Sequence, residues 1–401
     1  MPGARTHKIL IVNSGSSSLK FALFEMDGRE ALVLSGKLER IGLQHGTFHV
    51  RDAAGRTLVE ETDEKLPDHQ TAIRRLLDWL SQAGHSQNLD AAAHRVVHGG
   101  PRHSRPQRIT PELVDELKSL VPLASNHLPG ALAAIEALTR AHPSLAEIAC
   151  FDTAFHRQMP EVAQRYPLPR QYADEGVLRY GFHGLSYEYV LQELTQTAGA
   201  NADGRLVIAH LGNGASMAAV HNRRGLDTTM GFTPTGGLVM GTRAGDLDPG
   251  LPLYLLEQRG MTPAELHELL NRRSGLIGVS GLSSDMHDLL QREAASADAA
   301  LAVGLFCYQA RKFIGALAAA LGGLDELIFT GGIGENAAPV RARICEPLEF
   351  LGVAVDAARN EAGEAIISPP GGRVVVRVVK TNEELMMARH ANRLLRDVCA
   401  Q

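Results

Sequence analysis

Three short turns rich in glycine and small polar residues are candidate phosphate-binding elements of this sequence. They span residues 13–18, 212–216 and 331–336, and each directly follows an apolar run. Such turns expose backbone N–H groups, which form nests for anions. Any one of them is weak evidence, because glycine-rich turns usually only reverse the chain. Three of them, each after an apolar run, together indicate phosphate chemistry.

The familiar nucleotide-binding motifs are absent from the sequence. Neither GxxxxGK[ST] nor GxGxxG occurs, and the HRD and DFG motifs of protein kinases are missing as well. If the chain handles ATP, it therefore uses another architecture.

Four side chains near glycines or strand ends could act on an anionic ligand. Arg95 and Arg243 stand in glycine-flanked loops, where a guanidinium can make bidentate contacts with phosphate or carboxylate. Taken singly, such an arginine is more often part of a surface ion pair. His183, between Gly181 and Gly184, is also compatible with a structural role. Asp152 follows an apolar strand, where α/β folds place ligand sites, but it fits a helix N-cap equally well.

The elements that must position these residues alternate between short β-rich runs and longer helical runs, which is typical of an α/β fold. A chain of 401 residues is long enough for roughly two domains. We expect their boundary to be a short connection near residue 150. The predicted strands are 9–12, 19–26, 91–97, 147–151, 205–210, 216–220, 326–330 and 373–379, and the predicted helices are 70–83, 128–140, 251–259, 297–321 and one from about residue 383.

Two segments of the sequence share one pattern, which bears on the architecture. Residues 9–21 and 205–217 share a plan of apolar strand, small-residue turn and second strand. This similarity indicates either a duplicated unit with a ligand bound between its copies or two unrelated hairpins, and the pattern alone favours neither.

Composition and charge restrict the class of protein. The apolar fraction of 44% and charged fraction of 21% are ordinary for a globular chain, and the net charge of −5 attracts neither nucleic acid nor anionic lipid.

The four cysteines lie far apart without metal-ligand spacing, which favours reduced thiols. The N-terminal apolar run is too short for a signal peptide, and no stretch reaches the roughly 18 apolar residues of a membrane helix. We expect a soluble cytoplasmic protein that binds neither nucleic acid nor membrane.

Taken together, the segments resemble the acetate kinase family, in family order and over nearly the whole chain. The resemblance implies an α/β fold of two duplicated actin-like (ribonuclease H-like) domains with a nucleotide cleft between them. The domains would be 1–150, completed by a helix at 385–401, and 151–384, and the protein would be a homodimer. The matching stretches are 13–20, 94–100, 151–159, 179–184, 210–216, 227–249, 274–285, 328–336 and 381–389.

The activity that the resemblance implies is reversible transfer of the γ-phosphoryl group of ATP to acetate, giving acetyl phosphate and ADP. The metal would be Mg²⁺, with Mn²⁺ as an alternative. The acceptor carboxylate is already ionised at neutral pH and needs no general base. Catalysis must therefore come from positioning and from positive charge.

By family position, Arg95 and Arg243 would clamp the carboxylate and the moving phosphoryl group, and His183 would donate to its equatorial oxygens. Asp152 would orient the metal-bound phosphate and the arginines, and Asn13 and Glu383 would hold the metal. The acetate site would contain Arg95, Val97, Leu123, Phe182 and Pro234, and the nucleotide site Ser16, Ser18, Lys20, His210, Leu211, Gly212, Asn213, Gly214, Asp285, Met286, His287, Gly332, Ile333, Gly334, Glu335 and Asn336.

The sequence departs from the family pattern at three places. Ala124 and Ser125 replace the usual histidine and asparagine in a loop that borders the acyl pocket, which bears on acyl-chain preference. His287 replaces a common arginine on the adenine side, which bears on base or ribose selection. Tyr187 stands where histidine is usual, and the sequence alone gives no consequence for it.

Two alternative functions stay open. A kinase of the same family that acts on propionate or another short-chain carboxylate is one, because a methylene in an apolar pocket discriminates by only ~1–3 kcal/mol. The other is a non-catalytic nucleotide switch, since the superfold also serves actins and chaperones. The two arginines together with His183 and Asp152 argue against the switch.

Overall fold

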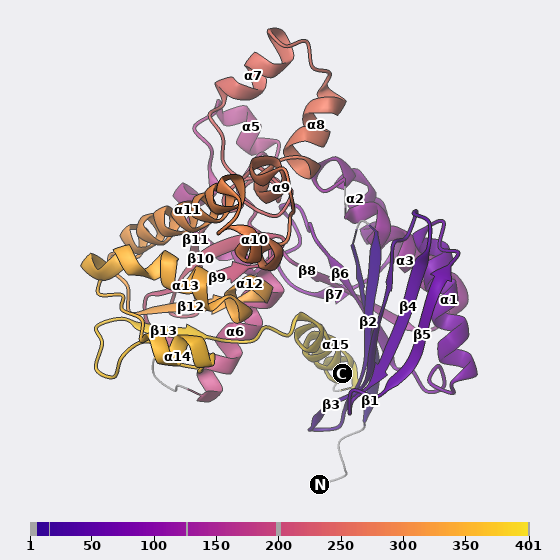
Figure 1. The fold of residues 1–401 in the computed structure, drawn as a ribbon. Coiled ribbons are helices and arrows are strands. Elements are labelled where there is room, and N and C mark those ends of the chain that lie inside the picture. The colour runs from indigo at the N-terminus through magenta and orange to yellow at the C-terminus, as the bar shows by residue number, and fades with distance from the viewer. Residues whose placement is uncertain (1–5, 16, 126, 198–201, 400–401) are drawn as a thin grey trace. The chain divides into compact units, whose positions relative to one another are not determined.

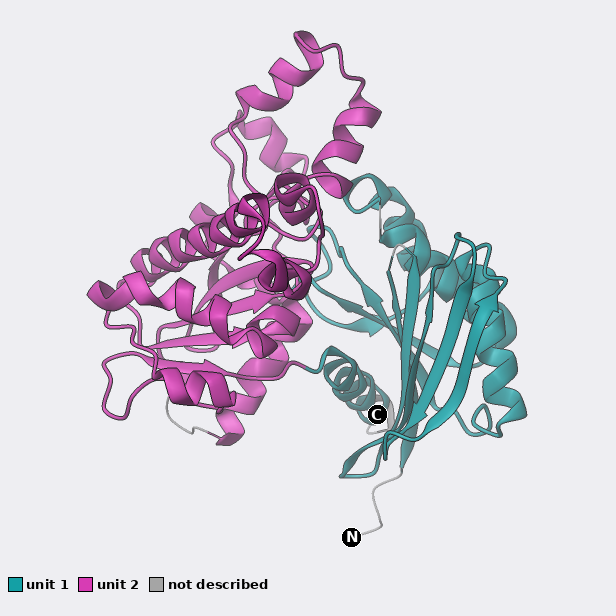
Figure 2. Ribbon diagram, in the orientation of Figure 1, with its two compact units in different colours: residues 1–154, 382–401 teal, residues 155–381 magenta. Residues whose placement is uncertain are grey.

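The computed structural model describes residues 6–15, 17–125, 127–197 and 202–399. The chain divides into two units: unit 1 is residues 1–154 with 382–401, and unit 2 is residues 155–381 (Figure 2). Each unit has its own mixed β-sheet with helices packed against it (Figure 1).

Unit 1 has an eight-stranded sheet in the order β5-β4-β3-β2-β1-β6-β8-β7. At its centre β1 pairs antiparallel with β2 and parallel with β6, and β6 pairs parallel with β8. Central strands of this kind are covered on both faces, which explains their nearly continuous apolar sequences. The strands are β1 (His7–Ser14), β2 (Ser18–Met26), β3 (Glu30–Glu39), β4 (Gly46–Asp52), β5 (Thr57–Glu64), β6 (Ala91–Val96), β7 (Gln107–Arg108) and β8 (Ala146–Phe151).

The helices of unit 1 bury the two faces of this sheet. On one face α3 (Leu128–Ala141) packs against β1 and β6, α1 (His69–Gln82) packs against α3 and β2, and α2 (Pro111–Ser119) lies against α3. On the other face α15 (Glu383–Cys399) packs against β1, β2 and β6 (Figure 1). The 3₁₀ turn η1 (Val121–Leu123) follows α2, and a second 3₁₀ turn, η2 (Ala154–Gln158), follows β8 and leads into unit 2.

Unit 2 has a five-stranded sheet in the order β11-β10-β9-β12-β13. The long helix α11 packs against β9, β10 and β11, and α6 packs against β9. The strands are β9 (Leu206–Leu211), β10 (Ala215–His221), β11 (Arg224–Thr228), β12 (Glu326–Thr330) and β13 (Val375–Val378). The helices are α4 (Glu161–Gln164), α5 (Arg170–Asp174), α6 (Gly184–Thr197), α7 (Gly250–Glu257), α8 (Pro263–Arg272), α9 (Gly275–Ser280), α10 (Met286–Arg292), α11 (Ala297–Leu321), α12 (Gly331–Asn336), α13 (Ala338–Cys345), η4 (Glu346–Leu351) and α14 (Ala357–Ala362).

The two sheets repeat one topology. In unit 1 the segment β3-β2-β1-β6-β8 has two antiparallel pairs followed by two parallel pairs. In unit 2 the whole sheet β11-β10-β9-β12-β13 has the same order and the same directions. The two similar turns of the sequence analysis join β1 to β2 and β9 to β10, the first two strands of each copy. This confirms the duplicated actin-like α/β fold, and the hypothesis of two unrelated hairpins is wrong.

The predicted strands and helices are present, with ends within two residues of those expected. One prediction of local structure is wrong: residues 331–336 form the short helix α12 rather than a turn. Gly331, at φ +77°, lets the chain leave β12, and the carboxylate of Glu335 then accepts its N–H at 2.9 Å. Among the described residues, no helix is both long enough and apolar enough to cross a membrane.

Candidate functional site

Unit 1 places three of the predicted residues at one edge of its sheet. In the parallel pairs, Val12 lies beside His94, and Val96 lies beside Phe151. Asn13, Arg95 and Asp152 therefore lie at or next to the carboxyl ends of three adjacent strands, β1, β6 and β8. This edge is where open α/β sheets bind their ligands.

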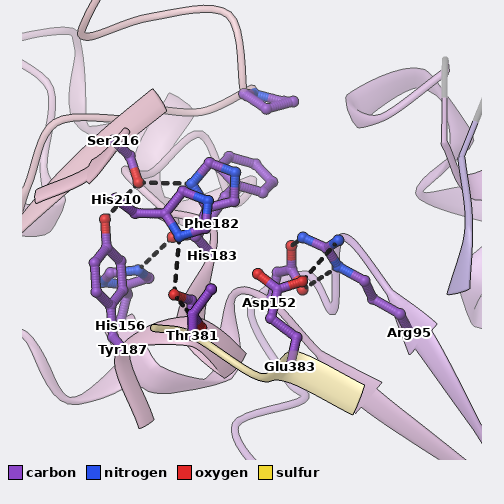
Figure 3. Close-up of polar contacts among 12 residues, drawn as sticks. Arg95, Asp152, His156, Phe182, His183, Tyr187, His210, Ser216, Thr381 and Glu383 are labelled. Atoms are coloured by element: carbon purple, nitrogen blue, oxygen red, sulfur yellow. Dashed lines mark hydrogen bonds and ion pairs between the residues drawn. The ribbon is translucent and has the colours of Figure 1, made fainter. Parts of the chain in front are cut away.

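The guanidinium of Arg95 is bound by two carboxylates of unit 1 (Figure 3). Its Nε and Nη2 donate to the two oxygens of Asp152 at 2.9 and 2.7 Å, and its Nη1 lies 3.0 Å from Glu383 Oε2. Burial opposes the charge on Arg95, but Asp152 and Glu383 outweigh it and raise the pKa above its usual value. Arg95 is thus a permanent cation held in one orientation.

Asn13 and Glu383, the predicted metal ligands, offer only oxygen donors suitable for a hard divalent cation. Asn13 is in β1, and Glu383 begins α15, which packs against β1. Within the described ranges, no group of three His, Cys, Asp or Glu side chains could hold a metal by itself. Mg²⁺ suits such a sparse donor set, since it commonly binds one or two protein oxygens together with substrate phosphates.

The predicted acyl-pocket residues are divided between the units. In unit 1, Val97 is buried just after β6, and Leu123 is half-buried at the end of η1. In unit 2, Phe182 is buried directly before His183, and the carbonyl of Pro234 accepts a hydrogen bond from Arg243 Nη1 at 2.7 Å.

His183 of unit 2 has an unusual backbone conformation, at φ +59°, just before α6. Such a conformation is strained for a residue other than glycine and persists only where the surroundings enforce it. Its neighbour Phe182 is held through its carbonyl by His156 Nε2 at 3.0 Å. Burial lowers the pKa of His156 to about 4, so this ring is neutral and donates its Nε2–H. Gly181 is required beside it, because a Cβ there would lie 2.5 Å from the His156 ring.

The His183 ring stacks on His210, with centroids 4.2 Å apart and planes inclined by 21° (Figure 3). His183 Nδ1 is hydrogen-bonded to Ser216 Oγ at 2.8 Å, and His210 Nδ1 to Ser186 Oγ at 2.8 Å. The two imidazoles, predicted for catalysis and for nucleotide binding, therefore form one pair.

Arg243 differs from Arg95 in having no acidic partner within the described residues. Its Nη1 donates a hydrogen bond to the Pro234 carbonyl, and burial lowers its pKa to about 10, so that it remains a cation at neutral pH. A Cβ on Gly214 would lie 2.6 Å from Arg243 Nη2 and 3.5 Å from His183 Nε2. The β9–β10 turn, a cation without a counter-ion and an imidazole thus meet in one place, which suits an anion. The interpretation of Arg243 as half of a surface ion pair is wrong.

A pocket of about 650 Å³ in unit 2 collects half of the predicted nucleotide residues. They come from the β9–β10 turn, the start of α10 and α12, segments far apart in sequence. The predicted residues in its wall are Gly212, Asn213, Asp285, Met286, His287, Gly332, Ile333 and Asn336, and those that the sequence did not indicate are Ser284, Leu290, Gln291, Ala337 and Pro339. Its size is that of a small-molecule site.

Several predicted nucleotide residues lie outside this wall. Leu211 ends β9, and Gly334 and Glu335 lie in α12, where the Glu335 carboxylate accepts N–H groups of Gly331 and Thr381 at 2.9 and 3.0 Å. The Glu335 carboxylate is therefore engaged by backbone N–H groups of unit 2. Ser18 and Lys20 lie on β2 of unit 1, with Lys20 exposed. Ser16 lies outside the described residues.

Two further side chains on this pocket have local partners. Asp285 caps α10 by accepting the N–H of His287 at 2.9 Å, and Gln291 Nε2 contacts His287 Nε2 at 2.8 Å. Gln291 was missed from the sequence, although its i+4 spacing from His287 on a helix was the signal that could have revealed it.

Comparisons with known proteins agree with this architecture. The chain matches the model of the acetokinase family over residues 8–389. It is 47% identical to an acetate kinase of Rhodopseudomonas palustris (strain TIE-1) over 392 residues, which cover 96% of this chain and 98% of that protein. It is 42% identical to an acetate kinase of Bacillus subtilis (strain 168), over 96% and 99% of the two chains.

Two solved structures are similar over almost their entire length. The acetate kinase of Porphyromonas gingivalis is 38% identical with a TM-score of 0.88, covering 97% of this chain and 100% of that one. A propionate kinase from Francisella tularensis is 34% identical with a TM-score of 0.90, covering 96% and 98%. With its duplicated fold and a match along nearly its full length, the chain belongs to the acetokinase family.

Proposed function

We propose that this protein is an acetate kinase, which reversibly transfers the γ-phosphoryl group of ATP to acetate and forms acetyl phosphate and ADP. The observation that carries the proposal is the position of Arg243. It is a cation without an acidic partner in the described residues, next to His183 and the Gly214 turn. The same turn continues into the wall of the 650 Å³ pocket.

The chemistry of the reaction fits side chains that position and neutralise rather than transfer protons. Acetate is ionised at neutral pH and attacks without a base, but it must approach a polyanion. We propose that Arg95, fixed by Asp152 and Glu383, binds the carboxylate. Arg243 and His183 then stabilise the charge on the equatorial oxygens of the moving phosphoryl group.

The remaining predicted residues take supporting roles in this proposal. His210 and the 211–214 segment hold phosphates, and residues 285–287 with Gly332, Ile333 and Asn336 enclose the nucleoside. Ser16, Ser18 and Lys20 assist by family position. Mg²⁺ would be held by Asn13 and Glu383, with Mn²⁺ as a substitute, and would neutralise phosphate charge. Val97, Leu123, Phe182 and Pro234 would contact the acetate methyl group.

A direct experiment tests the activity. The purified protein is incubated with MgATP, acetate and hydroxylamine, which traps an acyl phosphate as its hydroxamate. We expect acetate-dependent hydroxamate and stoichiometric ADP. ADP release without hydroxamate, or neither product, would favour a nucleotide switch over a kinase.

A propionate kinase is the second candidate, supported by the similarity to the Francisella tularensis structure and by Ala124 and Ser125. Ala124 is buried after η1, on the loop predicted to border the acyl pocket. Relative kcat/KM values for acetate, propionate and butyrate decide between the two. For an acetate kinase we expect a preference over propionate of about 10- to 200-fold, the effect of one methylene.

We also propose that the protein is a cytoplasmic homodimer. Its described cysteines include Cys307 and Cys345 as buried free thiols, as suits a reducing compartment. The helix α7 exposes Leu251, Leu253 and Tyr254, at 40, 54 and 47% of their full areas. An exposed apolar helix face of this kind supports contact with a second copy.

A further inference from the structure

Two chains of hydrogen-bonded hydroxyl groups, in which Tyr187, Ser216 and Ser186 are buried, end on the stacked imidazoles of unit 2. In the first, the Tyr187 hydroxyl contacts Ser216 Oγ, which lies 2.8 Å from His183 Nδ1. In the second, Thr381 Oγ1 donates to Ser186 Oγ at 2.9 Å, and Ser186 Oγ lies 2.8 Å from His210 Nδ1. Figure 3 shows Tyr187, Ser216 and Thr381 around the two rings.

The first chain has a preferred direction of hydrogen donation. Ser216 is fully buried and has one hydrogen to share between two neighbours. A phenol is far more acidic than an aliphatic alcohol and is therefore the better donor. Tyr187 accordingly donates to Ser216 Oγ, and the Ser216 hydrogen goes to His183 Nδ1. An Nδ1 that accepts a hydrogen bond leaves the ring proton on Nε2.

The second chain has the same direction. Because Ser186 Oγ accepts from Thr381, its own hydrogen is available for His210 Nδ1. His210 then also carries its proton on Nε2. The two rings thus have the same tautomer, each set by a serine that a second hydroxyl orients.

The Nε2 atoms of both rings face the glycine turn between β9 and β10. A Cβ on Gly214 would lie 3.5 Å from His183 Nε2, and a Cβ on Gly212 would lie 4.0 Å from His210 Nε2. This is the turn next to Arg243. The protonated nitrogens therefore point to where the proposed phosphate binds.

Neutral rings suit this arrangement better than charged ones. Two imidazolium charges with ring centroids 4.2 Å apart would repel each other, and Arg243 close to Gly214 adds a third positive charge. Neutral donors provide two aligned N–H groups without that repulsion.

We propose that Tyr187 and Ser216, with Thr381 and Ser186, are positioning residues that keep His183 and His210 as a pair of neutral Nε2–H donors for the transferred phosphoryl group. The tautomer is a property of the protein alone, whereas its use in catalysis rests on the proposed function. The proposal accounts for Tyr187, whose presence the sequence left unexplained.

The tautomer can be measured on the full-length protein without any ligand. Histidine is labelled with ¹⁵N, and long-range ¹H–¹⁵N spectra are recorded at neutral pH, with the His183 signal among the 17 histidines assigned by its loss in H183Q. We expect a bare Nδ1 and a protonated Nε2. In Tyr187→Phe the ring stays packed against Phe155 and His156, but the donor to Ser216 is gone, and we expect a mixture of tautomers. An Nδ1–H form in the unaltered protein, or the same tautomer in Y187F and S216A as in the unaltered protein, would overturn the proposal.

Kinetics separate this proposal from the proposed function. For Y187F we expect kcat to fall about tenfold with the KM for ATP unchanged, because one transition-state hydrogen bond is weakened. The matched control is Tyr180→Phe, which removes another buried hydroxyl, donated to the Gly176 carbonyl at 2.7 Å, and should leave kcat unchanged. If H183Q turns over fully while the unaltered protein shows the expected tautomer, the catalytic role of His183 is contradicted, but the control of its tautomer by Tyr187 and Ser216 is not. If the tautomer is unchanged in Y187F and H183Q has no turnover, only the control of the tautomer by Tyr187 and Ser216 is contradicted.

Discussion

Both oxygens of Asp152 accept hydrogen bonds from Arg95, at 2.9 Å from Nε and 2.7 Å from Nη2. A bidentate pair of this kind fixes the plane of the guanidinium as well as its position. Arg243 has no such acid among the described residues, and its pKa is lowered by burial, whereas that of Arg95 is raised. The two arginines therefore differ in what holds them, and variants of each should behave differently.

Asp152→Asn is expected to reduce both stability and activity. It removes a charge that compensates Arg95 in a buried setting, and we expect a loss of about 3 kcal/mol in the free energy of unfolding and of roughly 100-fold in kcat. Urea unfolding and the hydroxamate assay measure the two effects. Asp203→Asn is the matched control, because its ion pair with Arg223 is about half exposed, and it should alter neither quantity. Equal behaviour of the two variants would show that the Arg95 pair has no special role.

Arg243→Ala should reduce activity without reducing stability. The side chain carries a poorly solvated charge with no acidic partner in the described part of unit 2, so its removal relieves an unfavourable burial. We expect an unchanged or higher melting temperature and a fall in kcat of about 10³-fold. Added guanidinium ion should restore part of the turnover. A marked loss of thermal stability would mean that Arg243 is a structural residue.

Gly214→Ala should weaken nucleotide turnover, because its Cβ would lie 2.6 Å from Arg243 Nη2 and displace that side chain. We expect a rise in the KM for ATP and a lower kcat, measured by steady-state kinetics. Gly304→Ala is the control, since Gly304 is exposed in α11 and has no atom near the added Cβ. That change should leave turnover intact and raise stability by about 0.5–1 kcal/mol. A normal KM for ATP in G214A would argue against the contact.

The buried His156 should make the protein less stable in mild acid. Its pKa is lowered to about 4 in the folded protein, but returns to about 6.5 on unfolding. Between these values the unfolded chain binds more protons, so stability is complete above pH 6.5 and falls as the pH decreases towards 4. We expect His156 to contribute a loss of about 2 kcal/mol between pH 7 and pH 5. Urea unfolding at both values should show this loss in the unaltered protein and not in His156→Gln, and equal losses in the two would contradict the prediction.

Leu253→Asp should separate the proposed homodimer. The substitution places a charge on the exposed apolar face of α7, and its burial against a second copy would be unfavourable. Light scattering after size-exclusion chromatography should give a dimer mass for the unaltered protein and a monomer mass for the variant. Leu58→Asp, exposed on β5, is the control and should remain dimeric. A dimer in both would place the contact elsewhere.

Much of the fold follows from local patterns in the sequence. The apolar runs that become β1 and β9, with their small-residue turns, indicated the two hairpins, and the family resemblance indicated the duplication. The helix α12 was missed because glycine at 331, 332 and 334 has low helix propensity. This helix is held by a side chain of the next helix, α13: Arg341 Nη1 donates to the carbonyls of Gly334 and Glu335, both at 2.9 Å.

The candidate site was less accessible to sequence reasoning than the fold. Arg95, Arg243, His183 and Asp152 stood out by their positions beside glycines or a strand end, but the roles of all the site residues came from the family pattern and stay predictions. What the sequence could not indicate is which side chains hold them. Ser216 lies 33 residues from His183, and Asp152 lies 57 residues from Arg95, so no local spacing reveals either pair.

The position of α15 has a consequence for the order of events during synthesis. Unit 1 needs α15 to cover β1 and β6, with Met386, Met387, Ala388 and Ala391 buried, yet the whole of unit 2 is translated between those strands and this helix. A nascent chain therefore carries a half-covered apolar sheet while unit 2 emerges from the ribosome. Such surfaces attract chaperones and favour aggregation. Unit 2, contiguous in sequence, can mature first, and unit 1 is completed only when its closing helix leaves the exit tunnel.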